Sequence, residues 1–315
     1  MSRLSRLPRH LTTAALGVIC ALSITSCSNG SVTPDAAAAP KRPAADGSAS
    51  ASPSPTATPL SAATLGHLAD ASVNIADGQR IGVGLPISVT FKRPIPKAER
   101  ADVERQLKVT ANPGVTGSWA WIKDRNLHDG QRVDFRPQDY WKPGTEVSVK
   151  AGPSLSRSFT VSRSLVATVD VRSHQMKVVK DGAPTQTIPI TAGRPPYETW
   201  NGTMVVLDKQ RKVFMDSRTV NIADTYQGWY GYAVHLTTSG TYLHENTRAN
   251  TFAGKQNVTH GCVGLASDGT ARRFYEQVIP GDVVRVVNSK DQVAPGNGYG
   301  DWNLSWSEWR SLSAL

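Results

Sequence analysis

Short stretches of alternating apolar and polar residues occupy the chain from about residue 64 to 160. Alternation with a period of two is typical of strands that bury one face. Turn-forming Gly, Pro, Asn and Asp residues separate the stretches. Residues 96–105 depart from this pattern and allow a helical turn. The pattern therefore predicts a small all-β sandwich with strands at residues 87–91, 106–110, 119–121, 133–135 and 147–149.

A second β-rich region extends from about residue 164 to 290. Within it, Ser267 is a suitable N-cap for a helix through Val278. Phe274 and Val278 would then share the apolar face of that helix. We therefore expect a mainly β chain with one short helix in this region. Apolar or alternating runs predict strands at residues 164–171, 175–179, 187–192, 202–207 and 283–287.

The C-terminal residues 291–315 carry three tryptophans with helical spacing. Trp302, Trp306 and Trp309 stand at positions i, i+4 and i+7, which places them on one face of a helix. An apolar helix face of this kind packs against a folded domain. We therefore expect the tryptophans to pack this extension onto the preceding domain.

The N-terminus has the pattern of an export signal. Basic residues precede an apolar run at residues 11–24, which is short for a membrane span. The small residues directly before Cys27 resemble a bacterial lipobox, so we expect residues 1–26 to be removed and Cys27 to carry lipid. An ordinary signal peptide with an incidental cysteine is the alternative. Residues 27–63 are rich in Ala, Pro and Ser and are expected to form a disordered tether.

Composition and charge narrow the function classes. The chain has 315 residues, of which 39% are hydrophobic and 19% charged, and this excludes collagen-like, coiled-coil and multi-span membrane proteins. The formal net charge is +10, and loss of the three arginines in residues 1–26 would leave about +7. The sequence has no dense basic stripe with interleaved aromatic residues, so a nucleic acid is not an expected partner.

The three cysteines are more informative than the charge. Two of them lie within the first 27 residues, so only Cys262 belongs to the regions expected to fold. This excludes a disulfide framework, and any zinc site with two or more cysteine ligands, in those regions. His244 and His260 precede Cys262, and an imidazole near a thiol can take its proton. Gly261 allows a sharp turn whose backbone N–H groups could stabilise an oxyanion. The pattern indicates a nucleophilic cysteine.

Other interpretations of these residues stay open at this point. A lone cysteine is often a small buried apolar residue. His244, His260 and Cys262 could instead ligate zinc with a fourth ligand that the sequence does not identify. Either histidine could also be a structural residue held by ordinary hydrogen bonds.

The motif around Cys262 resembles that of the YkuD-type L,D-transpeptidase catalytic domain. In that family a histidine is followed, after a gap, by Ser/Thr-His-Gly-Cys. This chain has His244 and then Thr259, His260, Gly261 and Cys262. The spacing and order of these residues make the motif specific.

The resemblance extends to about residues 64–315. Residues 267–276 and 281–284 are similar to the helix and closing strand that follow the family's cysteine, and residues 141–145 resemble a turn of the immunoglobulin-like domain that precedes it in actinobacterial members. The tryptophan-containing tail matches their C-terminal extension. The implied organisation is an immunoglobulin-like β-sandwich at 64–162, a β-rich YkuD-type catalytic domain with a short helix at 163–290, and the extension at 291–315.

The resemblance implies a role for each residue of the motif. Cys262 would be the nucleophile and His244 its general base. The backbone carbonyl of Glu245 would orient the imidazole. No metal ion or organic cofactor is implied, because the reaction is covalent acyl transfer. Further support of the oxyanion and the active site is implied for His260, Gly261, Glu245 and Thr259.

A flap over the active site is also implied, and residues 214–217 look like the segment that enters it. Our candidates for flap residues that contact substrate are Met215, Tyr230 and Tyr232. Val220 stands where relatives carry a tyrosine. The sequence does not decide which aromatic residue substitutes for it among Tyr226, Trp229, Tyr230 and Tyr232.

Two further positions depart from the family pattern. Glu245 follows the first histidine, where the family has Gly or Ser, but a backbone carbonyl does not depend on the side chain. Gly264 stands two residues after the cysteine, where the family has Arg or Asn. Any polar contact made by that side chain is therefore lost or moved in this chain.

The implied activity is formation of 3→3 cross-links between peptidoglycan stem peptides, with tetrapeptide stems as donors. Carbapenems are expected to acylate Cys262. The implied location is the outer face of the cytoplasmic membrane, where a lipid anchor would hold the protein facing the cell wall. Alternatives are an L,D-carboxypeptidase, another hydrolase or lipoprotein-transferring enzyme with the same site, and a catalytically silent wall-binding lipoprotein.

Overall fold

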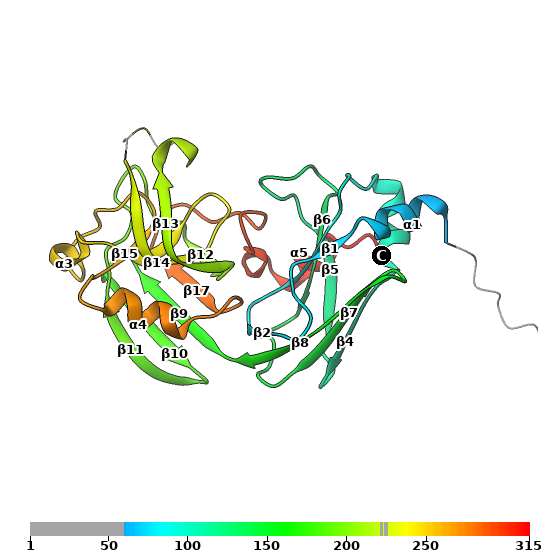
Figure 1. Cartoon of the computed structure of the whole chain (residues 1–315), viewed down its shortest axis with the longest axis horizontal. Coiled ribbons are helices and arrows are strands. Elements are labelled where there is room, and N and C mark those ends of the chain that lie inside the picture. The colour runs from blue at the N-terminus through cyan, green and yellow to red at the C-terminus, as the bar shows by residue number, and fades with distance from the viewer. Residues whose placement is uncertain (1–59, 221–222, 224–225) are drawn as a thin grey trace, which may run out of the picture. The chain divides into compact units, whose positions relative to one another are not determined.

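Four β-sheets form the framework of the described chain, which comprises residues 60–220, 223 and 226–315 of the computed structural model (Figure 1). The predictions of an export signal, of lipid on Cys27 and of a tether up to residue 59 lie outside these residues. Within the described residues, no helix is both long and apolar enough to cross a membrane.

The first two sheets form the predicted sandwich. One has the strand order β1-β3-β6-β5 and the other the order β2-β8-β7-β4. Both contribute to one apolar core, in which Phe91 and Trp141 are buried. The strands are β1 (Ser72–Val73), β2 (Gln79–Gly82), β3 (Ile87–Thr90), β4 (Leu107–Asn112), β5 (Gly117–Trp121), β6 (Arg132–Pro137), β7 (Glu146–Ala151) and β8 (Leu155–Arg163).

Three short helical segments accompany the sandwich. The helical turn predicted within residues 96–105 is confirmed as the 3-10 helix η1 (Lys97–Glu99) followed by α2 (Arg100–Glu104). The helix α1 (Ala62–Ala69) begins at the end of the region predicted as a tether. It does so because the Thr64 backbone N–H donates to Oγ of Ser61 at 3.1 Å, which satisfies one free N–H of the first turn.

The other two sheets form the second β-rich region. Their orders are β11-β10-β9-β17-β12 and β13-β14-β15-β16. Apolar side chains from both, including Met176 and Leu243, share a second core with Phe274. The strands are β9 (Leu165–Asp170), β10 (Gln175–Lys180), β11 (Ala183–Pro189), β12 (Gly202–Val205), β13 (Asp208–Asp216), β14 (Gln227–His235), β15 (Tyr242–Glu245), β16 (Val263–Leu265) and β17 (Val283–Val287).

The helical segments of this region are η2 (Ser217–Val220), α3 (Ala249–Phe252) and α4 (Thr270–Gln277). The helix predicted to start after Ser267 starts later, with Gly269 as its N-cap. Ser267 is not a cap because its backbone N–H donates to Asn250 Oδ1 at 2.9 Å and its hydroxyl accepts from Asn250 Nδ2 at 2.8 Å. The apolar face is as predicted, since Phe274 and Val278 are buried.

Contacts at a tight turn attach the sandwich to the second region. The Gly82 N–H donates to the Pro280 carbonyl at 2.9 Å, and the Gly84 N–H donates to the Gly281 carbonyl at 2.8 Å. A Cβ at Gly82 would lie 2.4 Å from the Asp282 nitrogen, so only glycine permits this approach. The buried carboxylate of Asp282 also pairs with Arg163 at 2.8 Å.

The C-terminal tryptophans pack the extension onto the sandwich instead of the domain that directly precedes it, and they do not share one helix. Trp302 lies in the 3-10 helix η3 (Asp301–Asn303), and a second helix, α5 (Trp306–Ser311), begins after Ser305. Ser305 forms a capping box with Glu308, which starts a new helix at this point. All three rings instead contact the Arg136 guanidinium, with its carbon 4.7, 5.5 and 4.7 Å from the ring centres of Trp302, Trp306 and Trp309.

Candidate active site

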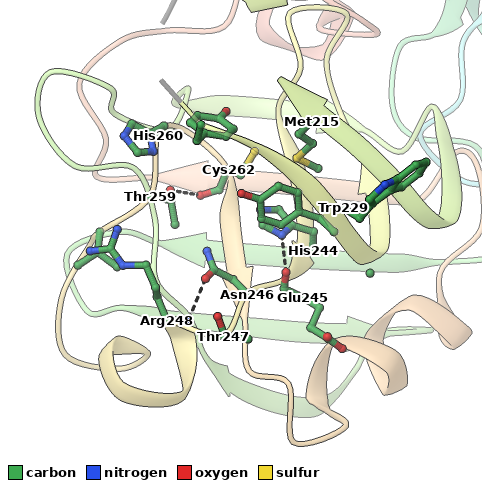
Figure 2. Close-up of a pocket in the computed structure, with 14 residues that line it drawn as sticks. Met215, Trp229, His244, Glu245, Asn246, Thr247, Arg248, Thr259, His260 and Cys262 are labelled. Atoms are coloured by element: carbon green, nitrogen blue, oxygen red, sulfur yellow. Dashed lines mark hydrogen bonds between the residues drawn. The ribbon is translucent and has the colours of Figure 1, made fainter. Parts of the chain in front are cut away.

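A pocket of about 370 Å³ opens where the β13–β14 hairpin lies beside β15 and the segment before β16. Figure 2 shows Cys262 and His244 on its wall. The structure therefore brings together residues that are 18 positions apart in the sequence. The lining residues are Met215, Tyr226, Trp229, Tyr230, Gly231, His244, Glu245, Asn246, Thr247, Arg248, Val258, Thr259, His260 and Cys262.

Parallel pairing of β15 with β16 places the histidine and the cysteine on neighbouring segments. Leu243 pairs with Val263 and His244 with Gly264, while Cys262 directly precedes β16. Leu243 and Val263 are fully buried, and they fix this register by anchoring both strands in the core. The side chains of His244 and Cys262 are also buried, with 3% and 8% of their surface exposed.

The His244 ring has a defined tautomer. Its Nδ1–H donates to the Glu245 carbonyl at 2.6 Å, and a carbonyl can only accept, so the proton lies on Nδ1. Burial lowers the pKa of His244 to about 4, against the opposing effect of this hydrogen bond. The imidazole is therefore neutral at pH 7, with an unprotonated Nε2 that can accept a proton. Tyr230 meets the ring edge-on at 4.7 Å between centres.

Cys262 rests as a thiol. Burial raises its pKa to about 11, although a hydrogen bond from the Tyr242 backbone acts in the opposite direction. The thiol also contacts the Gly240 carbonyl at 3.7 Å, as a weak donor. At neutral pH a thiol with this pKa is almost entirely protonated, so it needs a base to react as a nucleophile.

Two hydrogen bonds of Thr259 hold the turn before Cys262. The Thr259 hydroxyl donates to the Cys262 carbonyl at 2.5 Å, and the Thr259 N–H donates to the Ala192 carbonyl at 3.0 Å. Gly261 has φ of +111°, a conformation that side-chain-bearing residues rarely adopt. Gly261 is absent from the residues that line the pocket, and its conformation shapes the turn to which its own N–H and that of Cys262 belong.

His260 lies on the opposite side of the pocket from the Glu245 carbonyl (Figure 2). Tyr226 stacks on its ring at 5.0 Å between centres, with 30° between the ring planes. The Arg194 guanidinium lies 3.2 Å from His260 Nε2. These contacts hold His260 as part of the pocket wall.

One predicted flap residue was wrong. Met215 and Tyr230 line the pocket, but Tyr232 does not and packs 5.7 Å from the Tyr275 ring. Alternation alone would place Tyr230 and Tyr232 on the same face of β14. Tyr232 is re-aimed because its φ is +51° and it has no partner in the pairing of β13 with β14.

Seven lining residues were not among our predicted site residues, and Gly231 and Val258 are two of them. Tyr226 and Trp229, which the sequence left undecided, both reach the pocket from the flap. Asn246, Thr247 and Arg248 were missed entirely, although their position directly after His244 and Glu245 was a usable signal. They form a polar edge of the pocket where β15 ends and α3 begins.

A zinc site at this position has no suitable ligand set. Across residues 60–220, 223 and 226–315, no three His, Cys, Asp or Glu side chains are grouped so that they could hold a metal ion. In addition, Nδ1 of His244 is engaged by the Glu245 carbonyl. One pocket wall thus carries a thiol and a neutral imidazole, the two groups that a base-assisted cysteine nucleophile requires.

Two known domain families match the chain. Residues 41–153 match a bacterial Ig domain, and residues 164–286 match the YkuD family of L,D-transpeptidase catalytic domains. L,D-transpeptidase 5 of Mycobacterium tuberculosis is 32% identical over 263 residues, which are 78% of this chain and 56% of that protein. L,D-transpeptidase 2 of the same species is 31% identical and is covered over 63% of its length. The chain thus spans less than two thirds of these two relatives.

Other relatives are covered more completely. L,D-transpeptidase 1 of M. tuberculosis is 34% identical over 221 residues, which are 69% of this chain and 84% of that protein. A solved structure of the L,D-transpeptidase LdtMt1 in complex with imipenem has a TM-score of 0.62 and 33% identity, with 69% of this chain and 97% of that chain covered. L,D-transpeptidase 3 of M. tuberculosis with a faropenem-derived adduct has a TM-score of 0.59 and 33% identity, with 68% and 96% covered. This chain therefore belongs to the L,D-transpeptidase family.

Proposed function

We propose that this protein is an L,D-transpeptidase that forms 3→3 cross-links in peptidoglycan by acyl transfer through Cys262. The observation that carries the proposal is a buried thiol and a neutral imidazole, with an unprotonated Nε2, on the wall of one pocket. Family membership supports the same reaction class.

In the first half-reaction, His244 Nε2 takes the proton of the Cys262 thiol as the sulfur attacks the carbonyl carbon of the third residue of a donor tetrapeptide. The resulting tetrahedral intermediate collapses when its carbon–nitrogen bond breaks. The protonated imidazole gives its proton to the departing D-alanine amine. A thioester between Cys262 and the tripeptide stem remains, and the imidazole is neutral again.

In the second half-reaction, the side-chain amine of another stem attacks the thioester carbonyl. His244 takes a proton from the attacking amine and returns it to the sulfur as the carbon–sulfur bond breaks. The products are a new amide bond and the free thiol, so no oxidant, reductant or metal takes part.

Backbone N–H groups are available to stabilise the oxyanion of both tetrahedral intermediates. Neither the Gly261 nor the Cys262 N–H donates to another group within the described residues. Both belong to the turn that the positive φ of Gly261 creates. We therefore assign the oxyanion contacts to these two N–H groups.

Transfer and hydrolysis differ in the acceptor of the acyl group, which is an amine of another stem in transfer and water in hydrolysis. One assay separates the candidate functions. The purified protein is incubated with tetrapeptide muropeptides, and the products are identified by mass spectrometry. Cross-linked dimers with loss of one D-alanine per bond are the expected result. Tripeptides without dimers would instead make the protein an L,D-carboxypeptidase. An unchanged substrate would contradict both enzymes and favour a wall-binding protein.

We further propose that Cys27 carries lipid and holds the protein on the outer face of the cytoplasmic membrane. Support comes from the sequence, in which an apolar run and small residues precede Cys27 and a tether rich in Ala, Pro and Ser follows. Replacement of Cys27 by alanine is expected to leave an unprocessed precursor or to release the protein from the membrane fraction. Unchanged size and membrane retention of the Cys27→Ala protein on fractionation would contradict the anchor.

A further inference from the structure

Asn246 occupies a defined position beside the reactive pair. It follows the last residue of β15, and its side chain extends toward the side of the pocket that holds Cys262 (Figure 2). Its Oδ1 accepts a hydrogen bond from the Arg248 N–H at 2.9 Å. This bond fixes the orientation of the amide, so the Nδ2 end is the one left to face the pocket.

Gly264 makes room for this side chain. Gly264 lies on β16 opposite His244, and its nearest neighbours include Asn246, which follows the end of β15. A Cβ at position 264 would lie 2.8 Å from Thr191 Cγ2, 3.1 Å from Asn246 Cβ and 3.2 Å from Asn246 Nδ2. Any residue other than glycine would therefore displace either Thr191 or the Asn246 amide. The observed position of the Asn246 side chain therefore depends on glycine at position 264.

The Asn246 Nδ2 group is a donor that has no acceptor among the described residues. In the part of the chain that the structure describes, no hydrogen bond is made by Asn246 Nδ2, whereas Oδ1 is engaged. The amide is uncharged, so it suits an oxygen of a peptide carbonyl. The nearby Arg248, which also lines the pocket, would better suit a carboxylate.

We propose that Asn246 is a substrate-binding residue whose Nδ2 donates to a peptide carbonyl oxygen of the donor stem and so positions the stem at Cys262. This inference rests on the proposed function for its substrate. It assigns to the residue directly after β15, two positions beyond His244, a polar contact that β16 cannot make because position 264 is glycine.

Two substitutions separate this role from a structural one. Asn246→Ser and Asn246→Asp both keep an oxygen that can accept from the Arg248 N–H, but both lose the Nδ2 donor. If Asn246 served only as a cap for the turn, both variants would behave as wild type. The serine variant is neutral, so a loss that it shares with the aspartate variant is not caused by added charge.

Asn250 provides matched controls in the same segment. Its amide is fully engaged by Ser267, and it lies outside the pocket lining. Asn250→Asp adds the same charge to the same segment, and Asn250→Ser makes the same change in side-chain size. Neither is expected to alter turnover of tetrapeptide muropeptides.

The measurement has two parts. For turnover, both Asn246 variants should lower kcat/KM for tetrapeptide muropeptides by about 10- to 100-fold, as expected for one lost hydrogen bond to substrate. The rate of alkylation of Cys262 by iodoacetamide should stay at the wild-type value, because the reactive pair is intact. For binding, the same substitutions in the Cys262→Ala protein should raise the Kd for a tetrapeptide stem, measured by calorimetry, about 10-fold or more.

Wild-type kcat/KM and Kd in Asn246→Ser would overturn this inference and leave the proposed function intact. A parallel fall in the iodoacetamide rate would also overturn it, because Asn246 would then act through the thiol. If wild-type protein forms no product, the proposed function fails instead, and the binding measurement still decides whether Asn246 contacts the stem.

Discussion

Replacement of Cys262 by alanine is expected to abolish formation of cross-linked dimers from tetrapeptide muropeptides. The proposed thioester cannot form without the sulfur, and loss of a nucleophile lowers kcat by about 10⁴-fold or more. The substitution removes one buried atom from a side chain whose sulfur makes only weak contacts with the Gly240 and Tyr242 backbone, so the fold should persist. The measurement is product formation by mass spectrometry, with thermal unfolding as the control for the fold.

A serine at the same position gives a sharper control than alanine. Cys262→Ser keeps the shape of the side chain but offers a hydroxyl, whose pKa lies far above that of a thiol, to the same base. We expect it to lose nearly as much activity as the alanine variant. Dimer formation at a wild-type rate by either variant would show that the nucleophile lies elsewhere.

Replacement of His244 by alanine is expected to have the second-largest effect. With the thiol pKa raised to about 11, about one molecule in 10⁴ would hold a thiolate at pH 7 without a base. We therefore expect kcat/KM to fall by about 10³- to 10⁴-fold at pH 7. Because the remaining activity depends on direct ionisation of the thiol, it should rise about tenfold per pH unit above pH 7.

The pH dependence of wild-type kcat/KM follows from the pKa of His244. The imidazole must be neutral to act as a base, and its pKa is lowered to about 4, so it is neutral throughout the range above that value. The kcat/KM is therefore expected to stay level through neutral pH and to fall only as the pH approaches about 4. A decline centred near pH 6.5, the value of an unperturbed histidine, would contradict this account of His244.

The reactive pair could be predicted from the sequence because its signal is local. The order His244, Thr259, His260, Gly261 and Cys262 carries the chemistry in residue types and spacing, independent of tertiary detail. Strands β3 to β7 of the sandwich were also predictable, since apolar and polar residue types alternate along each of them, although only β4 and β7 bury alternate positions. The tryptophans of the C-terminal extension indicated that it packs onto folded chain, but not that its partner is the sandwich.

The strands of the flap and the direction of its side chains were harder to predict from the sequence. No residue of β13 is fully buried, so its sequence lacks the apolar alternation that predicts a strand. Tyr232 misled us because a positive φ and a skipped pairing change the face of its side chain, and neither is visible in the residue types. The break between η3 and α5 had a readable signal in Ser305 and Glu308, which outweighs the regular spacing of the tryptophans.

Asn246 was missed for a different reason. Its importance depends on Gly264, which is 18 positions away and becomes its neighbour only through the parallel pairing of β15 with β16. The sequence shows that position 264 lacks a side chain, but only the register shows which residue occupies the space.

The most direct test of the central claim is the intact mass of the protein after incubation with imipenem, the compound bound by a structural relative. The account predicts a stoichiometric covalent adduct on the wild-type protein that peptide mapping places on Cys262. No adduct should form on the Cys262→Ala protein. An adduct that persists in Cys262→Ala, or its absence from wild-type protein that is active on muropeptides, would contradict the assignment of Cys262 as the acyl-carrying residue.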